Sequence, residues 1–155
     1  MSDPDPIEQI HECFRRHVPE VANGTVALVK VARDVGNRTL VVVRASDVAV
    51  HPVAVCASPS KRIARELGEK LGVILYAADP AELIKNSLIP IGPSTNNPTP
   101  TITLDTDAGV AWVEVPPDSV TFLSTPGEAS RVALVSKLLG WDIRIIGGMR
   151  RGRFI

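Results

Sequence analysis

Two segments of the chain resemble each other residue by residue, and this internal repeat limits the possible folds more than any other feature. The segments are KRIARELGEKLGVIL, which begins at Lys61, and SRVALVSKLLGWDIR, which begins at Ser130. This alignment places Arg62 and Arg131 at equivalent positions, 69 residues apart. An internal duplication is the simplest explanation, because 155 residues suffice for two small domains. We therefore predict two copies of one α+β unit, each small enough to need its neighbour for stability.

The predicted secondary structure has the same order in both copies. Apolar residues at helical spacing predict helices, and β-branched runs separated by turn residues predict hairpins. In the first copy we predict a helix over 6–18, strands over 25–33 and 38–45, a short apolar segment after Pro52, a loop, a helix over 62–71 ended by Gly72, and a strand over 73–76. In the second copy we predict a helix from Pro80 to Leu88, a hairpin of TITLDT and VAWVEV, helices over 117–123 and 129–139, and the strand WDIRII. The composition of residues 90–100 predicts a loop or linker.

Composition indicates an intracellular location. The acidic N-terminus, MSDPDPIEQ, lacks the apolar core of a signal peptide, and no apolar run approaches the roughly 20 residues that cross a bilayer. Cys13 and Cys56 are too few for a disulfide framework. We expect a cytoplasmic protein that does not bind membranes.

The sequence contains no catalytic or metal-binding pattern. No serine, cysteine or histidine stands in a nucleophile motif, and neither a P-loop nor a dinucleotide fingerprint is present. On a helix, His11 and His17 lie about 240° apart, so they cannot hold one metal ion. Trp112 and Trp141 are assigned to core packing, because a single aromatic residue does not make a stacking surface for bases. We expect no enzymatic activity, no cofactor and no small-molecule substrate.

Charge is distributed unevenly although the whole chain is neutral. Residues 24–77 carry eight Lys/Arg and four Asp/Glu, a net +4, whereas residues 78–146 carry four and eight, a net −4. A tail at 147–155 adds Arg150, Arg151 and Arg153. This asymmetry suggests a polyanionic partner for the first copy. Two solvated surfaces that differ in charge are the alternative.

Several fragments resemble the tandem KH region of the NusA family of bacterial transcription factors. They are, in order, FRRHVPEVANGTVALVKVAR, RTLVVVRASD, HPVAVCA, ELG, DPAELIKNSL and LLGWDI. The resemblance covers roughly residues 14–146. It implies an α+β fold of two tandem KH domains of the prokaryotic type (type II), each a small three-stranded sheet covered by helices. The domains would span 1–77 and 78–146, followed by a basic tail at 147–155. It also implies RNA binding in transcription elongation, termination or antitermination.

The loops that define KH domains are altered in this chain. KH domains contact the nucleic-acid backbone through a GxxG loop between two helices. The first such loop would be Ser58–Lys61, with neither glycine, and the second would be Ser124–Gly127, with only the last. We predict that Ser58 is a helix N-cap followed by proline at the first helical position. We also predict that Thr125 and Glu128 form a capping box, which makes the second loop a cap and not a binding loop.

Two functions therefore stay open at this point. The first is weak, largely sequence-independent binding of single-stranded RNA, with side chains of the first domain replacing the lost glycine amides. The second is a KH pair that no longer binds RNA and serves as a protein-interaction scaffold on RNA polymerase, another transcription protein or a ribonucleoprotein. The candidate RNA-binding residues are Ser58, Ser60, Lys61, Arg62, Arg65, Arg150, Arg151 and Arg153.

Overall fold

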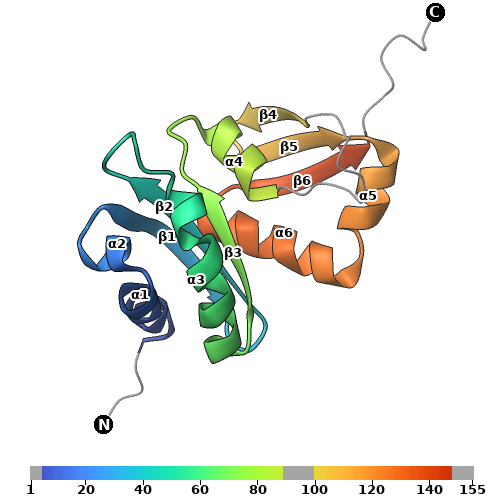
Figure 1. The fold of residues 1–155 in the computed structure, drawn as a ribbon. Coiled ribbons are helices and arrows are strands. Elements are labelled where there is room, and N and C mark those ends of the chain that lie inside the picture. Colours follow the sequence, from blue (N-terminus) through green and yellow to red (C-terminus); the bar gives the residue numbers. More distant parts are fainter. Residues whose placement is uncertain (1–4, 89–99, 148–155) are drawn as a thin grey trace, which may run out of the picture. The chain divides into compact units, whose positions relative to one another are not determined.

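Each half of the chain builds its own three-stranded sheet (Figure 1). The computed structural model describes residues 5–88 and 100–147. It divides into unit 1, Met1–Ala78, and unit 2, Asp79–Ile155. The predicted α+β class, with two small three-stranded sheets and helices, is confirmed.

Unit 1 has a mixed sheet in the order β1-β2-β3. The first two strands are antiparallel and form the predicted hairpin, whereas β2 and β3 are parallel. A parallel pair needs a crossover connection, and helix α3 provides it. The elements are α1 (Pro6–His17), α2 (Pro19–Ala22), β1 (Val26–Asp34), β2 (Arg38–Ala45), α3 (Pro52–Leu67) and β3 (Lys70–Leu75).

Unit 2 repeats this topology with one additional helix in the crossover. Its strands follow the order β4-β5-β6, again with one antiparallel and one parallel pair. The elements are α4 (Pro80–Leu88), β4 (Thr101–Asp105), β5 (Val110–Val115), α5 (Pro117–Leu123), α6 (Pro126–Leu139) and β6 (Asp142–Gly147).

The structure corrects the spacing of the repeat from 69 to 72 residues. Gly68 and Gly140 both end their helices in the left-handed conformation, with φ of 68° and 77°, and they stand 72 positions apart. The first residues of β3 and β6 have the same separation. Under this spacing Ile63 matches Val135, and both are fully buried. The alignment from sequence slipped by three residues because such a slip moves an apolar side chain to a neighbouring position on the same helix face.

The same correction ends helix α3 earlier than predicted. The sequence pattern placed its end at Gly72, but the chain leaves the helix at Gly68, whose positive φ suits glycine. Gly72 lies within β3, directly opposite Leu40 of β2. A Cβ atom at this position would come within 2.7 Å of the Leu40 Cδ2 atom. Glycine therefore makes room here for a side chain of the neighbouring strand.

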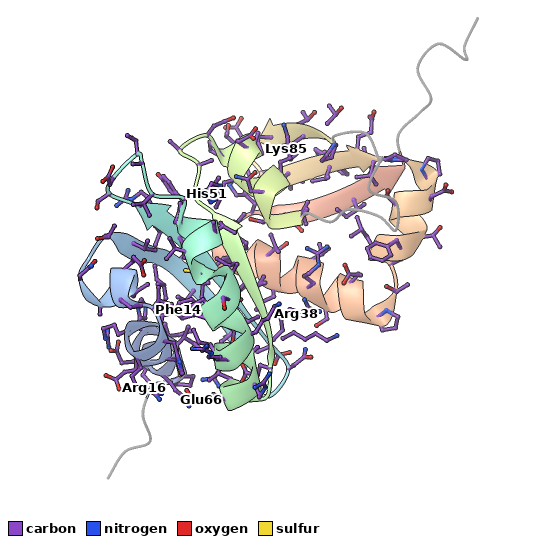
Figure 2. All side chains as sticks on the ribbon, in the orientation of Figure 1. Phe14, Arg16, Arg38, His51, Glu66 and Lys85 are labelled. Carbon is purple, nitrogen blue, oxygen red and sulfur yellow. The ribbon has the colours of Figure 1, made fainter. Side chains whose placement is uncertain are left out.

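Mostly aliphatic side chains form the core of unit 1, between the sheet and the two long helices. Phe14 of α1, labelled in Figure 2, is completely buried. It belongs to one cluster with Val41 and Val43 of β2 and Ile63 of α3. The cluster fixes which side of α1 and α3 faces the protein, and thus which side faces solvent.

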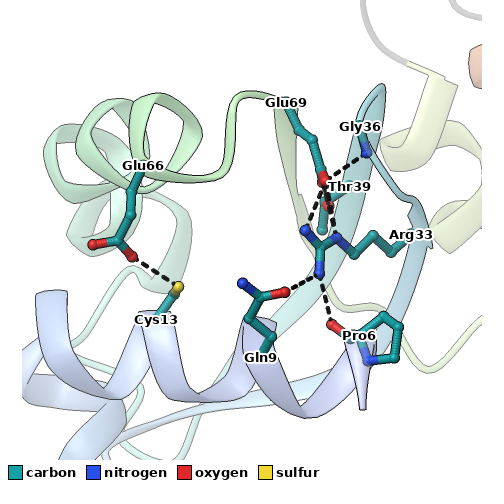
Figure 3. A network of polar contacts seen from close by, with 8 residues as sticks. All are labelled: Pro6, Gln9, Cys13, Arg33, Gly36, Thr39, Glu66 and Glu69. Carbon is teal, nitrogen blue, oxygen red and sulfur yellow. Dashed lines mark hydrogen bonds and ion pairs between the residues drawn. The ribbon is translucent and has the colours of Figure 1, made fainter. Parts of the chain in front are cut away.

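A buried ion pair joins the ends of several elements in unit 1 (Figure 3). The side chains of Arg33 and Glu69 are 5% and 1% exposed, and their closest approach, Arg33 Nη2 to Glu69 Oε2, is 2.7 Å. Glu69 also accepts hydrogen bonds from the Thr39 hydroxyl at 2.6 Å and the Gly36 amide at 2.8 Å. Arg33 also donates to the carbonyl of Pro6 and the side chain of Gln9. Burial alone would raise the pKa of Glu69, but these donors outweigh it and lower the pKa.

The Arg33–Glu69 pair yields the first prediction. Glu69→Ala leaves the buried Arg33 guanidinium without its counter-charge, so we expect unfolding free energy to fall by about 3–5 kcal/mol. Urea unfolding followed by circular dichroism measures this change. Glu12→Ala is the matched control, because Glu12 is 65% exposed and its pair with Arg15 spans 3.5 Å; we expect a change within about 0.5 kcal/mol. Equal effects of the two substitutions would contradict a structural role for the buried pair.

Candidate nucleic-acid interface

Helix α3 carries the candidate site and begins well before the predicted loop. Its N-cap is His51, whose Nδ1 atom accepts a hydrogen bond from the Ala54 amide at 3.2 Å, and Pro52 occupies the first turn. The helix then continues without interruption to Leu67, with Pro59 in its interior. The prediction that Ser58–Lys61 forms a loop, with Ser58 as N-cap, is therefore wrong.

The physical reason lies in two competing start signals. Proline is common at the first helical position, and both Pro52 and Pro59 satisfy this rule. The His51 cap favours the earlier start, and no described residue of α3 has a positive φ that would allow a tight turn. Pro59 lacks the amide hydrogen that would bond the Val55 carbonyl, so the interior position costs stability without ending the helix.

Four of the five candidate residues in α3 lie on its solvent side. Ser58, Lys61, Arg62 and Arg65 are all exposed. Their spacing places them within an arc of about 100° on the helix. Ser60 is only half-buried, and its hydroxyl donates to the Ala57 carbonyl at 2.8 Å, so it belongs to the helix and not to this face.

The three cations of this face, Lys61, Arg62 and Arg65, are named here the α3 basic face. Within residues 5–88 and 100–147, none of them forms an ion pair. Some other basic side chains of unit 1 are occupied. Arg16 pairs with Glu66, and Arg44 lies 5.4 Å from the ring centre of Tyr76. The α3 basic face is therefore a local concentration of positive charge that has no ion-pair partner among the described residues.

Glu66 fixes the orientation of the C-terminal turn of α3 against α1 (Figure 2). Its carboxylate accepts a hydrogen bond from the Cys13 thiol at 3.0 Å and lies 3.0 Å from Arg16 Nη2 and 3.5 Å from His17 Nε2. The Cys13 hydrogen bond and then those from Arg16 lower the pKa of Glu66 to about 2. Because Arg16 balances this charge, Glu66 does not cancel the neighbouring α3 basic face.

The two cysteines are protonated, buried side chains. Burial raises the pKa of Cys56 to about 11, and burial together with the Glu66 contact raises the pKa of Cys13 to about 11. Throughout the described ranges, no three His, Cys, Asp or Glu residues come together as a possible metal site. The helices described here include none with the length and apolarity required to cross a membrane.

Unit 2 retains the helix–turn–helix that unit 1 lacks. Ser124 and Thr125 connect α5 to α6, and Pro126 opens α6 as predicted. The capping box is wrong, however. Thr125 Oγ1 donates to the Phe122 carbonyl at 2.7 Å and caps no amide of α6, and Glu128 pairs with Arg131 at 3.0 Å. Because its carboxylate pairs with Arg131, Glu128 does not cap the start of α6.

Arg131 has a structural role in unit 2. It is 6% exposed and donates to the carbonyls of Ser87 and Leu88 at 3.2 and 3.3 Å. These are carbonyls at the end of α4, which lack partners within their own helix. Arg131 therefore closes α4, whereas Arg62, its match in the initial alignment, faces solvent.

Trp112 lies on the surface and not in the core. It is 37% exposed, while its neighbours Ala111 and Val113 are buried. Successive side chains of a strand point to opposite faces, so this alternation was the signal that should have placed Trp112 outside. Trp141, just before β6, is half-buried. The remaining candidates, Arg150, Arg151 and Arg153, lie outside the described residues.

Comparison with known proteins finds one matching family. Residues 5–76 match the family model described as the NusA-like first KH domain. Three curated relatives are each named transcription termination/antitermination protein NusA. They come from Rickettsia prowazekii (33% identity over 144 residues, 90% of this chain and 28% of that protein), Mycobacterium tuberculosis H37Rv (32% over 143, 89% and 40%) and Bacillus subtilis (33% over 140, 85% and 35%). This chain thus spans well under half the length of these relatives.

A solved structure shares the fold. The crystal structure of APE1850 superposes with a TM-score of 0.51 at 20% sequence identity, covering 86% of this chain and 96% of that one. At this identity the likeness concerns the fold alone.

The interior position of Pro59 yields a second prediction. Pro59→Ala restores an amide donor within α3, so we expect unfolding free energy to rise by about 1–3 kcal/mol, measured by thermal unfolding. Ser58→Ala serves as the companion variant. Loss of an N-cap would cost about 1 kcal/mol, whereas an exposed interior alanine is neutral or slightly stabilising. Destabilisation by both substitutions would show that the helix begins at Ser58.

The contacts of Glu66 yield a third prediction. Because its folded pKa, about 2, lies below the ordinary 4.5, the carboxylate stabilises the fold above pH 4.5 and loses this contribution as pH falls towards 2. Urea unfolding over this range compares the native chain with Glu66→Gln. We expect the difference in unfolding free energy to shrink as pH falls. A difference that stays constant would contradict the contacts assigned to this carboxylate.

Proposed function

Since the chain is a NusA-like tandem KH region, we propose that it binds single-stranded RNA weakly, and with little sequence preference, in transcription elongation, termination or antitermination. In this proposal the first KH domain, residues 1–77, supplies the principal contacts. The second domain, 78–146, and the tail, 147–155, have lesser roles. The printed names of the relatives support the transcription context.

The observation that carries the proposal is the α3 basic face. Its three cations are exposed, share one side of a rigid helix and have no ion-pair partner in the described ranges. Lysine and arginine at such positions attract phosphate oxygens whatever the base sequence. Ser58 lies about one helical turn before these cations. Its hydroxyl can donate a hydrogen bond to the phosphate backbone of the same RNA.

The helical conformation of Ser58–Lys61 explains why binding would be weak. In a KH domain the GxxG turn clamps the backbone of the nucleic acid. Unit 1 has an unbroken helix at this place, so its backbone amides are used inside α3 and only side chains remain for RNA. Unit 2 keeps the turn but has a net charge of −4 over residues 78–146, which disfavours phosphate. Arg150, Arg151 and Arg153 would add positive charge.

A second candidate function is a protein-interaction scaffold on RNA polymerase or a ribonucleoprotein. The absence of a GxxG-type turn from the described part of unit 1 favours it. A pull-down from nuclease-treated extract separates the two functions. Partners that persist after RNA is removed support the scaffold, and partners that are lost with the RNA support RNA binding.

The proposed contacts yield a fourth prediction. Three phosphate contacts on a single strand give a slope of log affinity against log salt of about −2, so affinity should fall about 16-fold between roughly 50 and 200 mM salt. Filter binding to oligo(U) measures this slope. Lys61→Ala with Arg62→Ala should abolish detectable binding.

The matched control removes the same charge elsewhere in unit 1. Lys30 and Lys70 are exposed residues of the sheet, and Lys30→Ala with Lys70→Ala lowers net charge by the same amount. We expect this double variant to retain binding within about twofold of the native chain. Equal losses in the two double variants would show that RNA responds to overall charge, and a flat salt dependence would exclude phosphate contacts altogether.

A further inference from the structure

Arg38, the first residue of β2, has a buried donor atom that lacks a hydrogen-bond partner. The residue, labelled in Figure 2, is half-buried as a whole, but its Nε atom is shielded from solvent. Among residues 5–88 and 100–147, no acceptor forms a hydrogen bond with this atom. An unpaired buried donor costs about 1–3 kcal/mol, and more when the group is charged, so binding an acceptor from outside would be favourable.

A second cation stands directly beside Arg38. The parallel register pairs Arg38 with Lys70, the first residue of β3, so both side chains leave the same face of the sheet. Lys70 is exposed, and within the described ranges neither residue forms an ion pair. Like charges at opposed positions of neighbouring strands repel each other. An anion held between the two side chains would remove this repulsion.

The acids near this pair do not neutralise it. Asp34 of β1 lies opposite Arg38 in the antiparallel register, but its Oδ2 atom accepts a hydrogen bond from Asn37 Nδ2 at 2.8 Å. In the described part of the chain, no ion pair joins Asp34 to either cation. Glu69, which precedes Lys70, points to the opposite face, where it belongs to the buried ion pair. The row of Asp34, Arg38 and Lys70 thus keeps a net positive charge.

The internal repeat indicates that the fold does not require two cations here. With the spacing of 72 residues, Arg38 and Lys70 match Val110 and Asp142 of unit 2, which are partners in the same parallel register. Unit 2 therefore builds the same sheet topology with an apolar side chain and an acid at these positions. The paired cations are a feature of unit 1 that the shared architecture does not demand.

We propose that Arg38 and Lys70 form a binding site for a phosphate-type oxyanion, either inorganic phosphate or the phosphate group of a small monoester. The Nε edge of a guanidinium presents two parallel N–H donors, which match two oxygens of a phosphate. The Arg38 stem is flexible and part of the side chain reaches solvent, so rotation about its bonds turns this edge towards Lys70. The Lys70 ammonium then contacts a third oxygen.

This oxyanion site is separate from the α3 basic face. Lys70 belongs to the control double variant, Lys30→Ala with Lys70→Ala, that is expected to retain oligo(U) binding. Conversely, Lys61→Ala with Arg62→Ala should leave phosphate binding unchanged. The two proposals can therefore fail independently of each other.

Nitrogen–proton correlation NMR of the full chain tests the proposal, because it observes the Nε–H group of an arginine directly. Arg38→Lys identifies the Arg38 signal by its disappearance. Titration with inorganic phosphate, against chloride at equal ionic strength, should shift this signal with saturation at a Kd of about 1–10 mM. Lys70→Ala should weaken the Kd about fivefold or more, whereas Lys30→Ala, which removes another exposed lysine of the sheet, should leave it within about twofold.

Phenyl phosphate distinguishes the two sources of the oxyanion. Tighter binding than that of inorganic phosphate supports a monoester ligand, and equal or weaker binding supports inorganic phosphate. Three results would overturn the proposal. They are a response of the Arg38 signal that equals the response to chloride, an unchanged Kd in Lys70→Ala, and displacement of bound phosphate by oligo(U), which would assign these cations to RNA. Thermal unfolding verifies that each variant folds, and Lys70→Gln replaces Lys70→Ala if the latter does not.

Discussion

Arg33 and Glu69 meet inside unit 1 at the point where the start of α1, the β1–β2 turn and the α3–β3 connection come together. A buried ion pair of this kind stabilises a fold only if its remaining hydrogen-bonding groups are also satisfied, and here Thr39, Gly36, Gln9 and Pro6 satisfy them. Gly68 ends α3 immediately before Glu69, and Glu66 attaches the last turn of α3 to α1. Together with the buried core cluster, these contacts hold the orientation of the α3 basic face.

The strands and most helices could be predicted because each depends on local patterns. The alternation in TITLDT and VAWVEV, or the Asp79-Pro80 start of α4, needs no distant contact to be understood. Errors arose where two local rules competed or where a rule was not followed through. Pro52 and Pro59 both satisfied the rule for a helix start, and packing of Cys56 and Ile63 against the same core extended one helix across both. Trp112 was assigned by its hydrophobicity, although the period of its strand placed it opposite its buried neighbours.

The two units treat the same crossover differently. In unit 2 the crossover is divided into α5 and α6. Its arginine, Arg131, donates hydrogen bonds to carbonyls at the end of α4. In unit 1 it is one helix whose basic residues face solvent. Candidate nucleic-acid contacts therefore rest on side chains of unit 1.

The parallel pairing of β2 with β3 has a consequence for how such a chain can change over generations. Two parallel neighbours cannot be joined by a tight bend, so some long connecting segment must always pass over the sheet. Mutation can change the solvent-facing residues of that segment, and can even remove a ligand-binding turn within it. The architecture is preserved because a crossover segment is still required. The fold can thus be retained after its surface has lost its original binding function.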